Sequence, residues 1–506
     1  MHDGTENSAI ESDQGREAPL AMDAESFRRT GHALVDSIAD FLKSLPERPV
    51  TPNDSLDAIR ALIDGDSALP ENGTDSGELL ERATRLLFDH SLFNAHPRFM
   101  GYVTSSPAPI GMLGDFLAAA VNQNVGAWRL SPVASEIEVQ TVRWIAELVG
   151  YPRDCGGLLV SGGNMANIVG LLTARVAALG SSVRDTGIGG PNAATLRVYA
   201  STETHTWIQK AVDIAGLGTH AIRWIPVDAR LRMNVDALRD AITEDQRAGA
   251  RPIMVAATAG SVSTGAVDPL VEIARVCREA GIWLHVDGAY GGFAAALPTA
   301  SDDLRALALA DSVALDPHKW LYAPLEAGCV LVRHSERLRE AFSYHPVYYH
   351  FGEEATNFFD FGPQNSRGFR ALKVWLSLQQ AGRNGYVRMI GDDIQLSREL
   401  YEQVDAYEEL EAMSQDLSIT TFRYVPPNLK AEIDETYLNQ LNQELLERLQ
   451  SSGEAFISNA VIGGRYVLRA CIVNFHTGAN DIQALPEIVV RHGRAVHEAL
   501  QSSDVR

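Results

Sequence analysis

Short apolar runs alternate with helical patterns through the middle of the chain, from about residue 106 to residue 385. The seven runs are GLLVSG (157–162), LRVYAS (196–201), AIRWIPV (221–227), IMVAATAG (253–260), IWLHVDGAY (282–290), SVALD (312–316) and GCVLVRH (328–334). Continuous apolar strands separated by amphipathic helices are typical of a mostly parallel sheet that helices cover on both faces. The pattern therefore predicts an α/β fold with a mostly parallel, seven-stranded central sheet.

The clearest helix between these strands covers Pro269–Ala280. Its apolar positions recur at the i, i+3, i+4, i+7 spacing of a helix face, at Leu270, Ile273, Ala274 and Cys277. Asp268 stands immediately before the proline, and proline is favoured at the first position of a helix. Because an Asp side chain can accept a hydrogen bond from the first turn, we expect Asp268 to be the N-cap.

The two ends of the chain have a different character. We expect residues 1–22 to be a disordered tail and residues 23–105 to be a helical segment, with Phe27, Leu34, Ile38 and Phe41 on one stripe. The large α/β domain then covers 106–385. Residues 386–506 are expected to form a small α+β domain. Its elements are a helix carrying Leu438, Leu441, Leu445 and Leu449, a strand over Tyr466–Phe475 and a final helix near Ile488–Leu500.

The charge and the cysteine content narrow the function. Lys and Arg number 43 against 65 Asp and Glu, a formal net charge of −22 that repels phosphate backbones and anionic lipids. We therefore expect neither nucleic acid nor a membrane as partner. No apolar stretch reaches the roughly 20 residues of a membrane span. Four scattered cysteines are too few for a disulfide framework and suit a cytoplasmic location.

Ligands in open α/β sheets bind at the carboxyl ends of the strands, so the residues that end each apolar run are the candidates for a site. The first run ends in the segment 161–164, Ser-Gly-Gly-Asn, which leads into a helical pattern. Glycines allow close backbone approach, and a helix N-terminus attracts phosphate. Neither the Rossmann nor the P-loop fingerprint is present. The segment is therefore either a phosphate cradle or an ordinary strand-to-helix turn.

Other runs end in residues with catalytic potential. Asp287 ends one buried strand. A buried carboxylate needs a partner, and three are open here: an arginine, a backbone N–H group that it caps, or the cationic ring nitrogen of a cofactor such as pyridoxal 5′-phosphate (PLP). Lys319 lies among apolar neighbours in a chain with only five lysines. A desolvated lysine becomes a nucleophilic amine that can form a Schiff base. The alternative is a lysine whose stem packs under Trp320.

Two further segments carry candidate side chains. His205 follows a strand end, and an imidazole there can stack on a planar ring or be structural. Tyr348 and Tyr349 lie in a long, weakly periodic segment typical of a mobile lid. His345 and His350 are five residues apart without a third ligand nearby, so we expect no metal site.

Together these motifs resemble the group II PLP-dependent amino-acid decarboxylases, the family of aromatic-L-amino-acid and glutamate decarboxylases. The resemblance extends from about residue 23 to the C-terminus. The resemblance rests on four motifs: HPRF (96–99), HVDGAYGG (285–292), DPHKWL (316–321) and SRGFRALKVW (366–375). The resemblance implies the PLP-dependent transferase fold, like that of aspartate aminotransferase. It also implies a homodimer with N-terminal helices that wrap over the partner.

The resemblance further implies a role for each candidate. Lys319 would bind PLP covalently, Asp287 would pair with the pyridine nitrogen, and His205 would stack on the ring. The phosphate would be surrounded by Gly163, Asn164 and His318, and Thr258 would lie near the ring. Two other matches are Tyr348, which would protonate the carbanionic carbon, and Arg367, which would support the site.

Some positions depart from the family pattern. Asp316 stands where asparagine is frequent, and an extra anion beside a phosphate is unfavourable unless it is paired or turned away. The positions where aromatic-specific members carry Phe-Pro and other large side chains hold Val103, Thr104, Ala127 and Asn94. Candidate clamps for an acidic substrate side chain are Arg98 and Arg129.

The expected reaction is decarboxylation of an L-amino acid, with aromatic substrates favoured, to the amine and CO2. Three alternatives from the same fold stay open: a glutamate- or aspartate-like substrate, an aldehyde synthase that couples decarboxylation to oxidative deamination, and an aminotransferase. A non-catalytic relative is a fourth, although the presence of Lys319 speaks against it. The presence of Tyr348 and His205 speaks against the aldehyde synthase, because aldehyde-forming members tend to lose one of the two.

Overall fold

The computed structural model describes residues 18–189, 195–344, 355–429 and 434–503. The chain divides into two compact units, Met1–Leu92 and Phe93–Arg506. The first unit contains helices α1 (Ala24–Ser44), α2 (Leu56–Ile63) and α3 (Ser76–His90). Side chains of Asp23, Ser55 and Asp75 cap the three helices, and no residue of these helices is buried. They are therefore amphipathic helices whose apolar stripes are incompletely covered within the unit.

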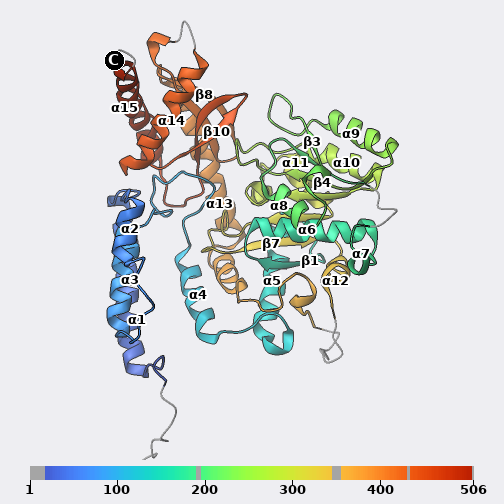
Figure 1. Cartoon of the computed structure of the whole chain (residues 1–506), viewed down its shortest axis with the longest axis horizontal. Helices are drawn as coiled ribbons and strands as arrows, with labels where there is room; N and C mark the ends of the chain where they lie inside the picture. The colour runs from blue at the N-terminus through green and yellow to red at the C-terminus, as the bar shows by residue number, and fades with distance from the viewer. Residues whose placement is uncertain (1–17, 190–194, 345–354, 430–433, 504–506) are drawn as a thin grey trace, which may run out of the picture. The chain divides into compact units, whose positions relative to one another are not determined.

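The second unit is built on a seven-stranded sheet (Figure 1). Its strands are β1 (Gly156–Val160), β2 (Leu196–Ser201), β3 (Ile222–Ile225), β4 (Arg251–Thr258), β5 (Trp283–Asp287), β6 (Ser312–Leu315) and β7 (Gly328–Val332). The strand order is β1-β7-β6-β5-β4-β2-β3. Only β7 is antiparallel to its neighbours. The prediction of a mostly parallel, seven-stranded sheet is confirmed, and all seven predicted strands are present.

Helices cover the two faces of this sheet with separate apolar cores. Successive residues of a strand point to opposite faces, and Val198 and Tyr199 of β2 accordingly belong to different core clusters. One core contains α6 (Gly163–Leu179) and α8 (Trp207–Ile214). The other contains α5 (Pro132–Leu148), α9 (Val235–Arg247) and α10 (Leu270–Ala280). Burial on both faces explains why the strands are continuously apolar.

Helix α10 corrects one expectation. It begins at Leu270 after Pro269, whose ψ of 70° is not helical, and Asp268 does not cap it. The buried carboxylate of Asp268 instead accepts hydrogen bonds from the backbone N–H of Met233, at 2.7 Å, and of Thr258, at 2.8 Å. Because the side chain turns inward, it ties the end of β4 to a neighbouring loop. Burial raises the pKa of Asp268 to about 6.

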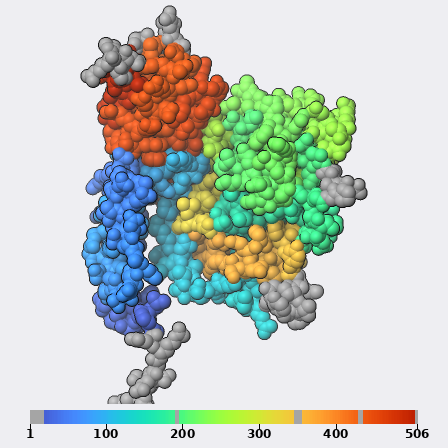
Figure 2. Space-filling view, in the orientation of Figure 1, coloured from blue at the N-terminus to red at the C-terminus, as the bar shows by residue number. Residues whose placement is uncertain are grey.

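The C-terminal part contains a second sheet, with all neighbours antiparallel and the order β10-β11-β9-β8. Its strands are β8 (Leu410–Asp416), β9 (Ile419–Tyr424), β10 (Ser458–Ile462) and β11 (Arg465–Cys471). Helices α14 (Glu435–Ser452) and α15 (Ala479–Ser503) pack on it with a core of their own. Figure 2 shows this part, in orange and red, as a lobe beside the green body. The predicted strand over Tyr466–Phe475 ends at Cys471, and the sequence analysis missed the other three.

The remaining helices connect these parts. They are α4 (Pro109–Val121), α7 (Val183–Thr186), α11 (Asp302–Arg305), α12 (Glu336–Phe342) and the long α13 (Ala371–Ala406). Helix α13 is kinked at Gly382, where φ is +62°. It packs against α4, α5 and the small sheet, so it runs through the predicted boundary at residue 385. The domain boundaries stay predictions.

Candidate active site

A cavity of about 480 Å³ lies at the carboxyl ends of the central strands. It brings together seven of the predicted residues: Gly163, Asn164, His205, Thr258, Asp287, His318 and Lys319. The strand register explains the convergence, because Thr258 is paired with Asp287 and Asp287 with Ala314, two residues before Asp316. Tyr348, Tyr349, His345 and His350 lie outside the described residues.

The start of α6 forms one wall of the cavity. Gly162 has a φ of +120°, which residues with a side chain rarely adopt. A Cβ atom on Gly163 would lie 2.7 Å from Oδ2 of Asp316 and 3.0 Å from Cβ of Ala289. Both glycines are therefore required by the close approach of these segments. No side chain caps the helix, so its first N–H groups are available to an anion.

Asp287 and Thr258 project from adjacent strand ends. Asp287 is 8% exposed, and its Oδ1 accepts a hydrogen bond from the N–H of Ala289 at 3.1 Å. Thr258 Oγ1 is buried and has no hydrogen-bond partner among the described residues. An unsatisfied buried hydroxyl at a cavity wall is unfavourable unless a bound group completes its hydrogen bonds.

A histidine beneath Asp287 was not singled out from the sequence, although it stands in the HVD motif. His285 is fully buried; its Nε2 lies 2.7 Å from Oδ1 of Asn167, and its Nδ1 lies 2.8 Å from Oγ of Ser312. Because an amide oxygen only accepts, Nε2 carries the proton. Burial lowers the pKa of His285 to about 4. A neutral His285 therefore orients Asn167, which lines the cavity.

Lys319 lies beside two polar neighbours from its own segment. Its Nζ is 3.1 Å from Oδ2 of Asp316, and Nε2 of His318 is 3.6 Å from the same oxygen. Oδ1 of Asp316 is buried without a partner in the described part of the chain. Burial lowers the pKa of His318, against the attraction of Asp316. The imidazole of His318 is therefore neutral near pH 7.

The segment that carries Lys319 is anchored from α13. The indole of Trp320 and the hydroxyl of Tyr322 both donate to Oδ2 of Asp393, at 2.9 and 2.7 Å. Trp320 also stacks on Tyr290, with ring centroids 4.8 Å apart. Burial raises the pKa of Asp393 to about 7. Because both aromatic neighbours of Lys319 are fixed, the lysine projects from a rigid segment.

His205 also lines the cavity. Its Nδ1 accepts a hydrogen bond from the N–H of Trp207 at 3.2 Å, which places the ring proton on Nε2. Partial burial lowers the pKa of His205, and Asp287 opposes that shift. The ring is therefore a neutral, planar surface facing the cavity.

Arg469 is a cavity residue that the sequence analysis missed. It lies in β11 of the small sheet, is 3% exposed and donates to the carbonyl oxygen of Tyr102. Its Nε has no hydrogen-bond partner among the described residues. The sequence analysis predicted the strand that carries Arg469 but did not connect this strand with the site. The position of Arg469 in that strand is the only signal that could have identified it.

Arg367 does not line the cavity. Its guanidinium is buried against Glu138 and donates to the carbonyl oxygens of Val125 and Leu159, each at 2.7 Å. Leu159 lies in β1, two residues before Ser161, so Arg367 holds the strand that leads into the cavity wall. Any support of the site by Arg367 is therefore indirect.

The substrate-pocket positions divide into two groups. Val103 and Thr104 line the cavity, whereas Asn94 and the buried Ala127 do not. Neither Arg98 nor Arg129 is a lining residue, so these expected clamps for an acidic side chain are absent from the cavity wall. The cations of the wall formed by described residues are Lys319 and Arg469.

The residues present fit PLP. An amine, a carboxylate, an uncapped helix start and an orphaned hydroxyl surround one space of suitable size. In that order, these four features suit the aldehyde, the pyridine nitrogen, the phosphate and the ring hydroxyl of PLP.

Comparison with known proteins settles the family. Residues 59–425 match the family described as the pyridoxal-dependent decarboxylase conserved domain. The chain belongs to this family. It is 36% identical over 472 residues to an aromatic-L-amino-acid decarboxylase of Bacillus atrophaeus, covering 92% of the chain and 94% of that protein. The chain is therefore a PLP-dependent amino-acid decarboxylase, a carboxy-lyase, and its cofactor is PLP.

Two further relatives bear on the product and the fold. A phenylacetaldehyde synthase of Petunia hybrida is 31% identical over 464 residues, covering 89% of the chain and 91% of that protein. The crystal structure of Oryza sativa TDC with PLP and tryptamine has a TM-score of 0.88 at 28% identity, covering 95% of the chain and 99% of that structure. The expected PLP-dependent transferase fold is confirmed.

Among the described residues, no helix is long and apolar enough to cross a membrane. None of the four cysteines, all within the described ranges, forms a disulfide.

Proposed function

We propose that this chain decarboxylates an aromatic L-amino acid to the corresponding amine. The observation that carries the substrate class is the 36% identity to an aromatic-L-amino-acid decarboxylase over nearly the whole of both chains. The cavity supports it. Among its lining residues are Tyr102, Val103 and Val262, and it lacks both expected arginine clamps for an acidic side chain.

PLP, when bound, accepts the electrons that the departing carboxylate leaves on the α-carbon. The residues of the chain supply orientation and charge. Lys319 provides the amine that attaches the cofactor, Asp287 the negative charge for the ring nitrogen, and His205 a neutral ring for stacking. Asn164 and the α6 start receive the phosphate, with His318 beside them. Thr258 Oγ1, which has no partner within the described ranges, is available to a ring substituent.

Arg469 is proposed to receive the carboxylate of the substrate. It is a buried cation of the cavity wall with unused hydrogen-bonding capacity at Nε. A guanidinium is well suited to a carboxylate, and a charge-assisted hydrogen bond in a partly desolvated cavity is stronger than a neutral one.

The product distinguishes two versions of the proposal. The amine requires a proton on the α-carbon, and we propose Tyr348 as its donor because of its match in the family segment HPVY. The presence of His205 in the cavity favours the amine. The similarity to phenylacetaldehyde synthase makes the aldehyde the second candidate.

We also propose a homodimer. Four apolar residues of α4 are more than half exposed: Leu113, Phe116, Leu117 and Val121. The first unit supports the same idea, because its three helices bury none of their residues. We further propose a cytoplasmic location, supported by the free cysteines, and a division of the chain at residues 22, 105 and 385.

The test is a screen of the purified, PLP-loaded protein against the common L-amino acids and hydroxylated aromatic ones. We expect CO2 release with aromatic substrates and amine as product. Preferential release from glutamate or aspartate would overturn the substrate class. Aldehyde with ammonia would establish the second candidate, and transfer of the amino group to a keto acid without CO2 would reject decarboxylation.

A substitution examines the proton donor. We expect Tyr348→Phe to divert product from amine toward aldehyde and ammonia in air-saturated buffer, where dissolved O2 is the two-electron oxidant, because the hydroxyl that protonates the α-carbon is removed while the ring remains. The measurement is the amine-to-aldehyde ratio by chromatography. An unchanged ratio would remove Tyr348 from this role.

A further inference from the structure

The carboxylate of Asp316 is buried beside the amine of Lys319, yet half of its hydrogen-bonding capacity is unused. Asp316 is 2% exposed, and its Oδ2 is 3.1 Å from Nζ of Lys319. Its Oδ1 is buried without a partner in the described part of the chain. A carboxylate that served only the fold would be satisfied at both oxygens. The position of Asp316 therefore calls for an explanation connected with the cavity.

Asp316 also lies against the start of α6. Its Oδ2 is 2.7 Å from the position that a Cβ on Gly163 would occupy. The helix has 17 residues and no side-chain cap, so its start carries unsatisfied N–H groups and positive potential. The two features of the cavity that attract an anion, the helix start and the Lys319 ammonium, thus both lie beside Asp316.

We propose that Asp316 is an internal counter-anion, which pairs with Lys319 whenever that amine is free and competes with the phosphate of PLP for the same positive field. The proposal rests on the proposed roles of Lys319 and of the α6 start. Asp316 acts through Lys319, so it is a positioning residue. The Asp316–Lys319 pair must open before the amine can bond to the cofactor. The carboxylate lies beside the α6 start that would receive the phosphate, and like charges would repel.

The competition predicts the direction of an isosteric change. In Asp316→Asn the side chain keeps its shape, loses its charge and gains an N–H donor, which a phosphate oxygen can accept. We expect this variant to bind PLP more tightly than the wild type, with a dissociation constant lower by roughly tenfold. Loss of packing or of folding cannot produce a gain in affinity, so the readout separates the proposal from a purely structural role.

The experiment compares the cofactor-free wild type with Asp316→Asn, Asp316→Ala and the matched control Asp213→Asn. Asp213 is exposed on α8, so its substitution makes the same change in net charge outside the cavity. PLP affinity is measured from the visible absorbance on titration. The dissociation constant of pyridoxine 5′-phosphate is measured by calorimetry. Because this ligand has no aldehyde, it cannot bond covalently to Lys319, and its affinity reports on non-covalent binding, including that of the phosphate. We expect tighter binding of both ligands to both Asp316 variants, and unchanged binding to Asp213→Asn.

Each result decides the proposal. Dissociation constants that are unchanged or raised in the Asp316 variants overturn it, since the carboxylate would then not compete. An equally large fall in the dissociation constant of Asp213→Asn also overturns the proposal, because the change in net charge alone would then explain the tighter binding. Failure of the proposed function looks different. In that case neither the wild type nor the Asp316 variants would show a visible absorbance that borohydride bleaches.

Discussion

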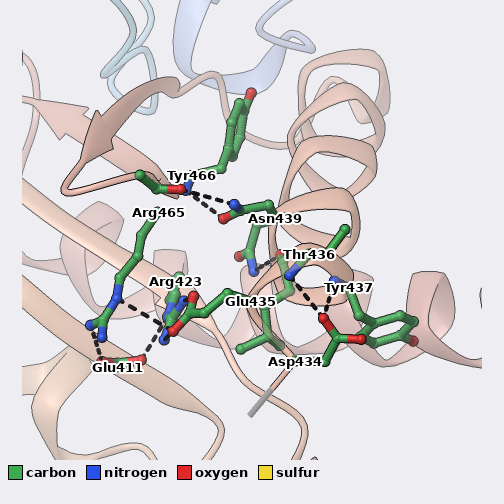
Figure 3. A network of polar contacts seen from close by, with 12 residues as sticks. Glu411, Arg423, Asp434, Glu435, Thr436, Tyr437, Asn439, Arg465 and Tyr466 are labelled. Carbon is green, nitrogen blue, oxygen red and sulfur yellow. Dashed lines mark hydrogen bonds and ion pairs between the residues drawn. The ribbon is translucent and has the colours of Figure 1, made fainter.

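Two arginines on neighbouring strands of the small sheet are both buried, yet they have opposite surroundings. Arg423 of β9 donates to Glu411 from Nε at 2.6 Å and to Glu435 from Nη1 at 2.6 Å and Nη2 at 3.3 Å (Figure 3). Arg465 closes the network, 3.5 Å from Glu411 and 3.4 Å from Glu435. Arg469 of β11 instead donates to the backbone carbonyl oxygen of Tyr102, and its Nε has no hydrogen-bond partner among the described residues.

The contrast separates a charge that maintains the fold from one that is available to a ligand. A buried charge is tolerated when its hydrogen bonds are complete, as at Arg423. At the cavity, three buried side-chain atoms have no hydrogen-bond partner among the described residues: Arg469 Nε, Thr258 Oγ1 and Asp316 Oδ1. Because these three atoms lie at one cavity, a single bound ligand could supply their missing partners.

The largest expected effect is at the amine of the cavity. Lys319→Ala should abolish turnover and the visible absorbance that borohydride bleaches. Lys373 is the matched control, since it is a buried lysine whose Nζ likewise lies close to an aspartate, 3.0 Å from Asp115. Lys373→Ala should keep the absorbance. Turnover by Lys319→Ala would reject the covalent role of Lys319.

The next effect is on stability. Arg423→Ala should lower the free energy of unfolding by about 3 kcal/mol, because it removes the buried cation between two carboxylates and leaves only the more exposed Arg465 beside them. Denaturant unfolding measures it. Arg494→Ala, which breaks a pair between an exposed arginine and Glu409, should cost less than Arg423→Ala. Equal losses in the two variants would show that the network of Figure 3 is worth no more than a surface pair.

The other arginine should behave in the opposite way. Arg469→Met should raise the KM for the amino acid by roughly 10- to 100-fold, the worth of a charge-assisted hydrogen bond, and should hardly change the denaturation midpoint. Arg465→Met, on the same strand but exposed, should leave KM unchanged. Steady-state kinetics decide between them. A stability loss in Arg469→Met as large as that of Arg423→Ala would erase the distinction.

The smallest effect depends on pH. The hydrogen bond from Arg423 lowers the pKa of Glu435 below its usual value of 4.5. The unfolded state therefore takes up the proton first on acidification, and the stabilisation is present above pH 4.5 and lost as the pH falls through the folded pKa. Glu435→Gln should thus be less stable than the wild type at pH 7 and converge with it in acid. A pH-independent difference would contradict the pairing.

The local pattern was sufficient for the large domain. Strands buried on both faces must be apolar throughout, so seven of them could be located from hydrophobicity alone. The small sheet could not, because β8 (LEAMSQD) is mostly half-buried and mixes polar with apolar residues. Asp268 shows the same limit at one residue. Its spacing suited a helix cap, but donors at Met233 and Thr258, distant in sequence, captured the carboxylate.

By itself the sequence determined the family, the cofactor and the order in which the site residues follow the strand ends, because these depend on short motifs and on the rule that parallel strands end at one edge. The tertiary structure decided which side chains meet there. Arg469 reaches the cavity from a strand 150 residues beyond Lys319, and the carboxylate of Asp316 lies against Gly163 at the start of α6. Such contacts depend on the packing of distant segments, which no local pattern specifies.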